Sequence, residues 1–249
     1  MPEEAPRIAL SVVIPCLNES RSLAGVIRWA EEGIHQSGLN GEVIVADNGS
    51  TDGSVEIATD AGARVVRVPS RGYGCAILGG IAAAAGDLVV IGDADGSYDF
   101  REIPRFVAAL RAGDDLVIGC RLARGGGAIG PGAMPWLNRV VGNPAFSWVA
   151  RTIFGLSCHD IHSGMRAASR RLLSSLPLRS AGMEFASEMI IRAHQARARI
   201  GEVPITLLPD RRGGRRSHLR PVRDGLRHIV LWFSLLKAPP PPRTGCGAV

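Results

Sequence analysis

The feature that most constrains the fold is an alternation of short apolar runs with segments of helical periodicity. The apolar runs are rich in β-branched residues and predict strands at 8–15, 42–47, 64–68, 87–93 and 115–120. Helical periodicity separates them, over 23–34, 54–61, 75–85 and 102–111. Strands that are apolar along their whole length are typical of a parallel sheet covered by helices on both faces. We therefore predict an α/β fold with a mainly parallel central sheet.

Polar residues follow three of the predicted strands at the point where each strand ends. They are Pro15, Asn18 and Glu19 after the first strand, Asp47 after the second, and Asp93, Ala94 and Asp95 after the fourth. In a parallel sheet these ends meet at one edge, which is where ligands bind. Asp and Ser also cap helices, and capping is the expected role of Ser50 and Asp52. The convergence predicts a binding site at this edge of the sheet.

Asp93 and Asp95 are separated by one residue, so their carboxylates repel each other unless a positive charge lies between them. Mg2+ and Mn2+ are held in proteins by one or two carboxylates, with phosphate oxygens and water completing the shell. A metal ion there would also stabilise a departing diphosphate. We predict that the two aspartates hold Mg2+ or Mn2+, and that this ion holds a nucleotide diphosphate.

The positive charge of the chain is concentrated in its C-terminal third. The net charge is +6, and ten arginines face three acidic residues between 192 and 227. Such a cluster suits phosphates, nucleic acid or an anionic membrane, or it forms a solvated face. Aromatic residues for base stacking are not interleaved with it, which argues against nucleic acid. Arginines also precede an apolar helical stretch at 220–236, which predicts either an interfacial helix on anionic lipid or a helix packed on the domain.

The cysteines and the apolar runs indicate the compartment. Five scattered cysteines with no CxxC spacing fit neither a disulfide framework nor a zinc site, so a reducing cytoplasm is expected. No stretch approaches the ~18 apolar residues that cross a bilayer, and the acidic N-terminus is unlike a signal peptide. We expect a cytoplasmic protein, at most peripheral at the inner face of the cytoplasmic membrane.

The second half of the chain has a looser pattern. The glycine- and proline-rich residues 123–135 predict a mobile loop. A helix is predicted over 136–154, kinked or broken at Pro144, and a polar turn before a helix is predicted over 158–166. Residues 184–198 predict a helix and 199–208 a strand, and the proline-rich tail 238–249 predicts disorder.

Many separate blocks, in order, resemble family 2 glycosyltransferases. The first are "SVVIPCLNE", "EVIVADNGSTDGS", "RGYGCAILGGIAAAAGD" and "VVIGDADGSYDF"; the later ones include "GAMPWLNRVVGNP", "DIHSGMRA" and "HLRPVRDGLRH". The later blocks resemble the dolichyl- or polyprenyl-phosphate sugar synthase branch. The resemblance implies a GT-A (nucleotide-diphospho-sugar transferase) fold, a Rossmann-like sandwich. It also implies one catalytic domain over 1–237, whose part 8–120 binds the nucleotide sugar and whose part 121–237 binds the acceptor.

The resemblance also implies roles for individual residues. On the donor side they are nucleoside contacts from Pro15, Asn18, Glu19 and Asp47, diphosphate contacts from Arg71 and the turn 72–74 with Gly74, and nucleotide and metal contacts from Asp93, Ala94 and Asp95. On the acceptor side they are phosphate contacts from Arg121, Arg139, Asn143, Ser163, Arg212 and His218. Asp95, Arg121 and Arg139 would be catalytic. The chain departs from many relatives at Asn48, where they have aspartate, and at Ser97, where close relatives have glutamine.

The reaction implied by the resemblance is inverting transfer of a sugar from UDP-glucose, UDP-N-acetylglucosamine or GDP-mannose to a polyprenyl phosphate. A phosphate monoester is largely ionised at neutral pH, so it needs arginines more than a base. A hydroxyl acceptor would need a carboxylate base, and the local candidates are Asp160, Glu184 and Glu188. We expect Asp160 to order its loop and the two glutamates to anchor the arginine-rich loop. The alternative is a soluble acceptor in polysaccharide or specialised-metabolite synthesis.

Two other enzyme classes fit less well. A sugar-1-phosphate nucleotidyltransferase would have a glycine-rich basic loop after the first strand, where this chain has "PCLNES". A dehydrogenase is suggested by "GYGCAILGG", but that segment follows the third strand and lacks the third glycine of the dinucleotide motif.

Overall fold

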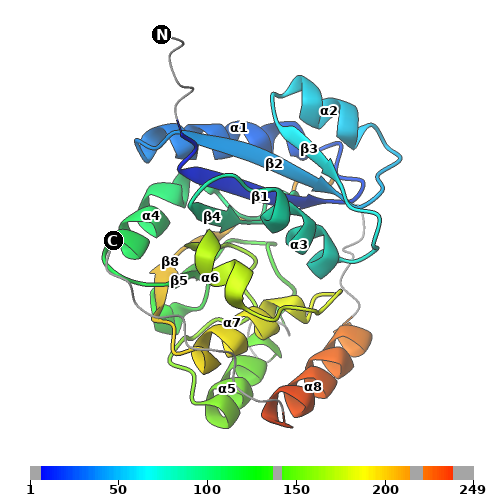
Figure 1. Cartoon of the computed structure of the whole chain (residues 1–249). Coiled ribbons are helices and arrows are strands. Elements are labelled where there is room, and N and C mark those ends of the chain that lie inside the picture. Colours follow the sequence, from blue (N-terminus) through cyan, green and yellow to red (C-terminus); the bar gives the residue numbers. More distant parts are fainter. Residues whose placement is uncertain (1–6, 137–141, 214–220, 238–249) are drawn as a thin grey trace.

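A sheet of seven strands runs through the centre of the computed structural model (Figure 1), which describes residues 7–136, 142–213 and 221–237. The strand order is β3-β2-β1-β4-β7-β5-β8. All neighbours are parallel except β7 (Arg166–Ser169), which runs antiparallel to β4 and β5 on either side of it. The mainly parallel α/β sheet predicted from the apolar runs is therefore confirmed.

The first half of the chain follows the predicted alternation closely. Its strands are β1 (Leu10–Cys16), β2 (Gly41–Asp47), β3 (Arg64–Arg67), β4 (Leu88–Ile91) and β5 (Leu116–Cys120). Its helices are α1 (Leu23–Gln36), α2 (Ser54–Asp60), α3 (Tyr73–Ala83) and α4 (Ile103–Arg111). The local pattern is sufficient here because every strand except β3 is mainly apolar, and β1 to β4 are each followed by a helix.

The second half contains α5 (Asn143–Phe154), α6 (Arg170–Ser175), α7 (Phe185–Gln195), α8 (Pro221–Lys237) and β8 (Ile200–Pro204). α5 begins next to Pro144, the residue at which the sequence predicted a kink or break, and Pro144 lies in its first turn, where a missing N–H costs no hydrogen bond. Residues 137–141 of the predicted helix lie outside the described residues. The predicted strand 199–208 is divided at Ile205 into β8 and β9 (Thr206–Leu207). The predicted loop 123–135 includes β6 (Ala128–Ile129), which pairs with β9.

The strand β7 was not predicted; a turn and a helix were expected at its place. It has only four residues, and its central Ala167 and Ala168 carry no β-branched side chain. Its strand conformation is set by the backbones of β4 and β5, between which it completes the sheet.

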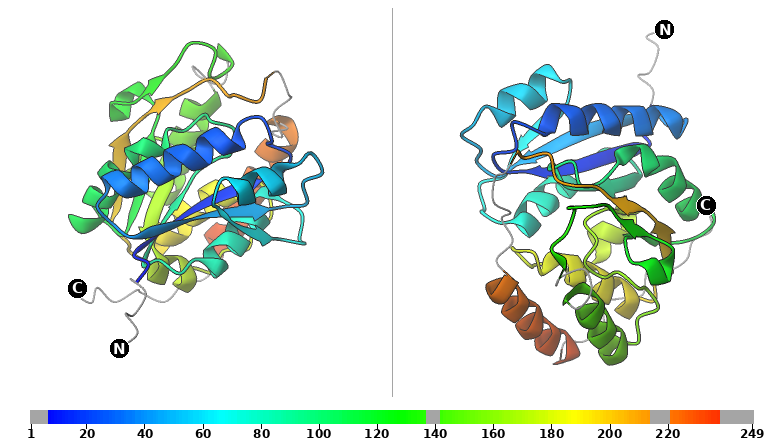
Figure 2. Two further views of the ribbon diagram at one scale, coloured as in Figure 1. Left: turned by 90° about the horizontal axis from the view of Figure 1, so that it is seen from above. Right: turned by 180° about the vertical axis from the view of Figure 1, so that it is seen from behind.

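Helices cover both faces of the sheet (Figure 2), and the side chains of β1 alternate between the two cores. Val12 and Ile14 pack under α1 and α4, whereas Val13 packs under α3, α6 and α7. The helices α5 and α8 lie outside this second layer, below α7 in Figure 1. The ends of β1, β2 and β4 lie at one edge of the sheet, because these neighbouring strands are parallel.

Candidate active site

The ends of β1 and β2 are tied together by hydrogen bonds around Asn18 and Asp47. Asn18, which has a left-handed backbone (φ 59°), accepts a hydrogen bond from the Thr51 N–H at 2.7 Å. The buried carboxylate of Asp47 accepts hydrogen bonds from the N–H groups of Gly49 and Ser50, both at 3.1 Å. Pro15 lies buried beside Ala46 in the ladder of β1 and β2. Beside Asp47 a cavity of about 440 Å³ opens between the loop 49–56 and residues 67–69.

The hydrogen bonds of Asn48 explain why this chain has an amide side chain where many relatives have a carboxylate. Its Nδ2 donates to the carbonyl oxygens of Val68 (3.1 Å) and Ser70 (2.7 Å), and its Oδ1 accepts from the Gly72 N–H at 2.7 Å. An aspartate could accept from Gly72 but could not donate to the two carbonyls. Asn48 therefore fixes the loop 68–72 that carries the exposed Arg71.

Gly74 has a packing role in the structure. A Cβ at this position would lie 2.0 Å from the carbonyl oxygen of Ser180, and the Gly74 N–H donates to Ala181 at 2.9 Å. This N–H is therefore occupied by the chain itself and is not open to a diphosphate. The predicted anion contact of the turn 72–74 remains a prediction for Arg71 alone.

Asp93 lies at the end of β4 and accepts a hydrogen bond from the Tyr73 hydroxyl at 2.8 Å. Burial, and next to it the charge of Asp95, raise the pKa of Asp93 to about 6. Gly164 lies against this carboxylate, since a Cβ there would be 2.5 Å from Oδ2. The predicted repulsion between the two aspartates is thus visible in the structure.

Asp95 has a cationic partner in Arg212. The Arg212 guanidinium Nη2 lies 3.3 Å from Asp95 Oδ2 and 3.2 Å from Asp210 Oδ2, and its Nη1 lies 3.7 Å from Glu19 Oε1. Arg212 is buried, and its Nε has no hydrogen-bond partner among the described residues. The other Asp95 oxygen accepts from the Ser97 N–H at 2.9 Å, so Ser97 contributes through its backbone.

The segment 208–213 is held over the aspartates by three contacts. The N–H of Leu208 donates to Ser97 (2.9 Å) and that of Arg211 donates to the carbonyl of Asp95 (2.8 Å). The Arg211 guanidinium stacks over the ring of Trp29, 4.2 Å from its centroid, and Arg101 lies 5.1 Å from the same ring. Trp29 is a buried residue of α1.

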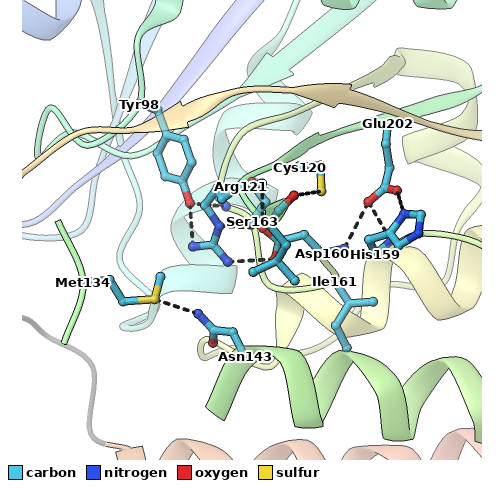
Figure 3. Close-up of polar contacts among 12 residues, drawn as sticks. Tyr98, Cys120, Arg121, Met134, Asn143, His159, Asp160, Ile161, Ser163 and Glu202 are labelled. Atoms are coloured by element: carbon cyan, nitrogen blue, oxygen red, sulfur yellow. Dashed lines mark hydrogen bonds and ion pairs between the residues drawn. The ribbon is translucent and has the colours of Figure 1, made fainter. Parts of the chain in front are cut away.

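Arg121 and Asp160 form a buried, bidentate ion pair (Figure 3). Arg121 Nε donates to Asp160 Oδ2 at 2.7 Å and Nη2 to Oδ1 at 2.8 Å, while Nη1 donates to the Tyr98 hydroxyl at 3.2 Å. Asp160 is inaccessible to solvent, and the Arg121 charge holds its pKa below the usual range despite burial. The loop-ordering role expected for Asp160 fits this geometry. Arg121 points into the protein, and its predicted phosphate contact remains untested.

The segment 158–166 places further predicted residues near the aspartates. Arg166 donates to the carbonyls of Ile161, Ser163 and Ala186, so it organises the loop from inside. Gly164 donates its N–H to the Tyr98 hydroxyl at 2.7 Å. The buried Ser163 Oγ has no hydrogen-bond partner among the described residues.

Of the remaining acceptor-side residues, Asn143 is described, and Arg139 and His218 lie outside the described residues. Asn143 is at the start of α5 and directs its Nδ2 to the Met134 sulfur at 3.1 Å, on the side of Arg121 shown in Figure 3. The phosphate contact expected of Asn143 remains a prediction.

Glu184 and Glu188 make their described hydrogen bonds to the segment 179–182, and residues 214–220 of the arginine-rich loop that we expected them to anchor lie outside the described residues. Glu188 accepts from the N–H groups of Arg179 (3.0 Å) and Ser180 (2.8 Å), and Glu184 accepts from Gly182 at 3.1 Å. They hold the segment 179–182, the same segment that packs on Gly74. Because these contacts join parts of the chain that fold against each other, helical spacing alone could not assign them.

Two tyrosines that were not predicted as site residues make contacts with the predicted ones. They are the only tyrosines in the chain, Tyr73 bonded to Asp93 and Tyr98 bonded to Arg121 and Gly164. Their place next to the "RGYG" and "GSYDF" blocks was the available signal, and it was read only for glycine and aspartate.

The residues at the edge suit a hard divalent cation. The guanidinium of Arg212 lies 3.3 Å from the carboxylate of Asp95, so a positive group is already present there. Burial and the charge of Asp95 disfavour the ionised form of Asp93. An added cation would relieve both effects. Among the described residues no group of three or more His, Cys, Asp or Glu side chains could hold a metal, so the protein would supply one or two ligands, as is common for Mg2+.

With this geometry established, comparison with known proteins decides the family. Residues 11–175 match the sequence model of the family described as "Glycosyl transferase family 2". The chain belongs to glycosyl transferase family 2. It is therefore a glycosyltransferase enzyme that uses a nucleotide sugar, and the GT-A fold predicted from the sequence is confirmed by its structural neighbours.

Three relatives from curated sequences place this glycosyltransferase more closely. It is 42% identical to the low-salt glycan biosynthesis hexosyltransferase Agl6 of Haloferax volcanii, over 92% of this chain but only 54% of that protein. It is 34% identical to the dolichyl-phosphate hexose transferase of the same organism, over 79% of this chain and 81% of that protein. It is 38% identical to an uncharacterised glycosyltransferase of Mycobacterium tuberculosis, over 92% of this chain and 98% of that protein.

Among solved structures, the glycosyltransferase is similar to glucosyl-3-phosphoglycerate synthase from Mycobacterium tuberculosis. That enzyme, in complex with Mn2+, UDP-glucose and phosphoglyceric acid, superposes with a TM-score of 0.69 at 27% identity, over 97% of this chain and 83% of that one. The resemblance to the polyprenyl-phosphate branch and the α/β sandwich stated from the sequence are consistent with these relatives.

Proposed function

We propose that this glycosyltransferase transfers a sugar, with inversion, from a nucleotide diphospho-sugar to a polyprenyl phosphate. An acceptor phosphate oxygen attacks the anomeric carbon, the bond from that carbon to the diphosphate oxygen breaks, and the electron pair leaves with the nucleoside diphosphate. UDP-glucose, UDP-N-acetylglucosamine and GDP-mannose are the candidate donors. Because the acceptor would lie in a bilayer, we also propose that the enzyme binds peripherally to the inner face of the cytoplasmic membrane.

The donor would bind across the ends of β1, β2 and β4. The cavity of about 440 Å³ beside Asp47 is large enough for a nucleoside, and it lies next to the loop that carries Arg71. Asp93 and Asp95 would hold Mg2+ or Mn2+, which supplies charge compensation to the diphosphate when bound. The structural neighbour bound to Mn2+ and UDP-glucose supports this arrangement.

The observation that supports a phosphate acceptor is that each acidic side chain on the acceptor side is already engaged in contacts within the protein. Asp160 is sealed in its bidentate pair with Arg121, and its lowered pKa makes it a weak base. Glu188 is occupied by two backbone N–H groups and Glu184 by one. An acceptor that is already ionised needs no such base. It needs positive charge, which Arg212 supplies with a buried Nε that has no hydrogen-bond partner among the described residues.

A soluble phosphorylated acceptor is the second candidate. The structural neighbours include complexes with phosphoglyceric acid, a small acceptor that also carries a phosphate. The arginines proposed here would serve either acceptor, so the acceptor has to be decided by experiment.

The test is to incubate the purified enzyme and Mg2+ or Mn2+ with each nucleotide sugar, alone, with a short polyprenyl phosphate, or with phosphoglyceric acid. Nucleoside diphosphate release and product mass are followed. A glycosyl polyprenyl phosphate that disappears in Asp95→Asn and persists in the surface variant Arg28→Gln supports the proposal. Product formed on phosphoglyceric acid and none on the lipid would replace it with the soluble acceptor.

A further inference from the structure

The exposed large hydrophobic side chains of the described residues gather in one region. Five of the eight are on α8 and two are on α5, and the eighth is Trp136, which precedes α5 in the sequence. Seven of them define what we call the apolar face: Trp148 and Ile153 on α5, and Leu226, Ile229, Val230, Phe233 and Leu236 on α8. The exposed fractions reach 63% for Trp148, 70% for Val230 and 63% for Phe233. A concentration of this kind on a folded surface marks an interaction site.

The helix α8 is amphipathic, and the structure shows which side is already used. Trp232 and Leu235 are buried against the core, where the Trp232 ring lies 5.8 Å from that of Phe146 on α5. His228 is also buried and bonds to Ser187 of α7 at 2.7 Å. The spacing 226, 229, 230, 233 and 236 places the exposed side chains on the opposite side of the helix. The sequence left open whether the helix packs on the domain or meets another surface, and the structure shows both a packed side and an exposed apolar one.

Charge indicates the kind of surface that would cover the apolar face. Arg223, Arg227 and Lys237 are exposed on α8, and its only acidic residue, Asp224, is buried. The sequence of α5 contains Arg151 and no acidic residue. In a symmetric pairing of two copies, these like charges would be brought together across the interface. Facing anionic lipid headgroups, each would be attracted instead.

We propose that the apolar face rests on an anionic lipid bilayer. Leu226, Val230 and Phe233 would enter the boundary between headgroups and acyl chains, with Arg223 and Arg227 on the phosphates. No helix among the described residues is long and apolar enough to span a membrane, so the contact would be made by the surface of the domain. The C-terminal residues 238–249 do not offer a rival cover from the sequence, because Val249 is their one large apolar residue.

The position of the face relative to the active site gives the contact a purpose, which rests on the proposed function. A groove of about 760 Å³ lies at the edge of the face, between Leu226, Val230 and Leu231 of α8 and the segment that contains Ser180 and Glu184. Ser180 also touches Gly74 at the start of α3, next to the Tyr73 that holds Asp93. A bilayer on the apolar face would therefore lie one chain segment away from the donor side of the site. A lipid phosphate could enter the site from there without leaving the membrane completely.

The test is sedimentation of the purified chain with vesicles, which requires neither donor sugar nor turnover. Vesicles of phosphatidylcholine alone are compared with vesicles of phosphatidylcholine and phosphatidylglycerol in equal parts. We expect binding to the anionic vesicles that weakens with salt. The double variant Val230→Ser, Phe233→Ser is expected to bind on the order of 30-fold more weakly, and Arg223→Gln, Arg227→Gln on the order of 30-fold more weakly to the anionic vesicles.

The matched control is Arg28→Gln, Arg111→Gln, which removes two exposed arginines from α1 and α4 on the other face of the sheet. It should change binding by no more than about twofold. Thermal melts check that each variant is folded. Absence of binding by the wild-type chain, or equal losses in the control, would overturn the proposal. So would a dimer in solution that Val230→Ser, Phe233→Ser converts to a monomer, because a second copy would then cover the face.

Sugar transfer to a short polyprenyl phosphate in detergent micelles separates this proposal from the proposed function. If the surface variants keep that transfer and lose vesicle binding, both proposals stand. If the wild-type chain binds vesicles and transfers no sugar to the lipid in any form, the surface is retained and the acceptor is wrong.

Discussion

Arg212 and Asp95 are joined across 117 positions of sequence by a contact of 3.3 Å between Nη2 and Oδ2. The same guanidinium lies 3.7 Å from Glu19, which follows β1, so one arginine from the C-terminal half connects the residues that follow two strand ends. Arg212 and a divalent cation would share Asp95 as a partner. A cation bound at the proposed site would therefore be coupled by electrostatics to the segment 208–213.

Arg212→Gln should strengthen binding of Mn2+ in the absence of nucleotide, because the competing positive charge is removed from Asp95. We expect the Kd for Mn2+ to fall about fivefold, which corresponds to an ion pair worth about 1 kcal/mol. Titration of Mn2+ followed by electron paramagnetic resonance measures it. The exposed arginine variant Arg223→Gln is the control and should not move the Kd. Weaker binding in Arg212→Gln would show that Arg212 supports the metal ligands instead.

Trp29→Leu should loosen the segment 208–213, because the ring that stacks on Arg211 and Arg101 is removed. Of the two arginines only Arg211 belongs to the segment, and its cation–π contact contributes about 0.5–1 kcal/mol, so the open state should become about two- to fivefold more populated. Trypsin reports this directly, since Arg211 and Arg212 are themselves cleavage sites. Trp29→Phe keeps an aromatic face and should be cut more slowly than Trp29→Leu. Equal cleavage of both variants at equal global stability would rule out a role of the stacking.

Asp160→Asn should destabilise the protein strongly, because it leaves the buried Arg121 guanidinium without its bidentate partner. Loss of one member of a buried pair costs about 3–5 kcal/mol. The exposed pair of Arg7 and Asp87 provides the control, and Asp87→Asn should cost less than about 1 kcal/mol. Urea unfolding of the three proteins measures both. A cost below about 1 kcal/mol for Asp160→Asn would mean that water or another group readily replaces the carboxylate.

Asp93→Asn should stabilise the metal-free protein at pH 7. The pKa of Asp93 is about 6 in the folded chain against an ordinary value of 3.8, so above pH 6 folding forces a charge into an unfavourable place. Removing that charge should raise the free energy of unfolding by on the order of 2 kcal/mol. The gain should shrink as the pH falls from 6 to 4 and vanish below about 4, where both forms are neutral. Urea unfolding across this range checks it, and a gain independent of pH would contradict the assignment to Asp93.

The same pKa predicts how activity depends on pH. Protonation of Asp93 below about pH 6 would weaken the cation site, so the metal concentration needed for half-maximal activity should rise as the pH falls through 6. Lower activity at pH 5 that excess Mn2+ restores is the expected result. Activity lost at pH 5 and unaffected by Mn2+ would assign the titration to another group.

Local pattern predicted the parts of the fold in which a residue's neighbours along the chain are also its structural context. The strands β1, β2, β4 and β5 are mainly apolar, and α1 to α4 repeat with the helical period, so both could be predicted from short windows of sequence. The meeting of Asp47, Asp93 and Asp95 at one edge also followed, because parallel strands place their carboxyl ends together. The sequence by itself thus determined the parallel strands of the sheet and the edge at which their carboxyl ends meet.

What only the tertiary structure decided are contacts between distant segments. The strand β7 forms because two other strands offer it their backbones, Arg121 faces inward because Asp160 meets it, and Arg212 reaches Asp95 because Trp29 holds Arg211. The amphipathic pattern of α8 was equally compatible with burial and with exposure on either side. A charge or an apolar side chain acquires its role from the groups that surround it in space, and those groups are fixed only when the whole chain has folded.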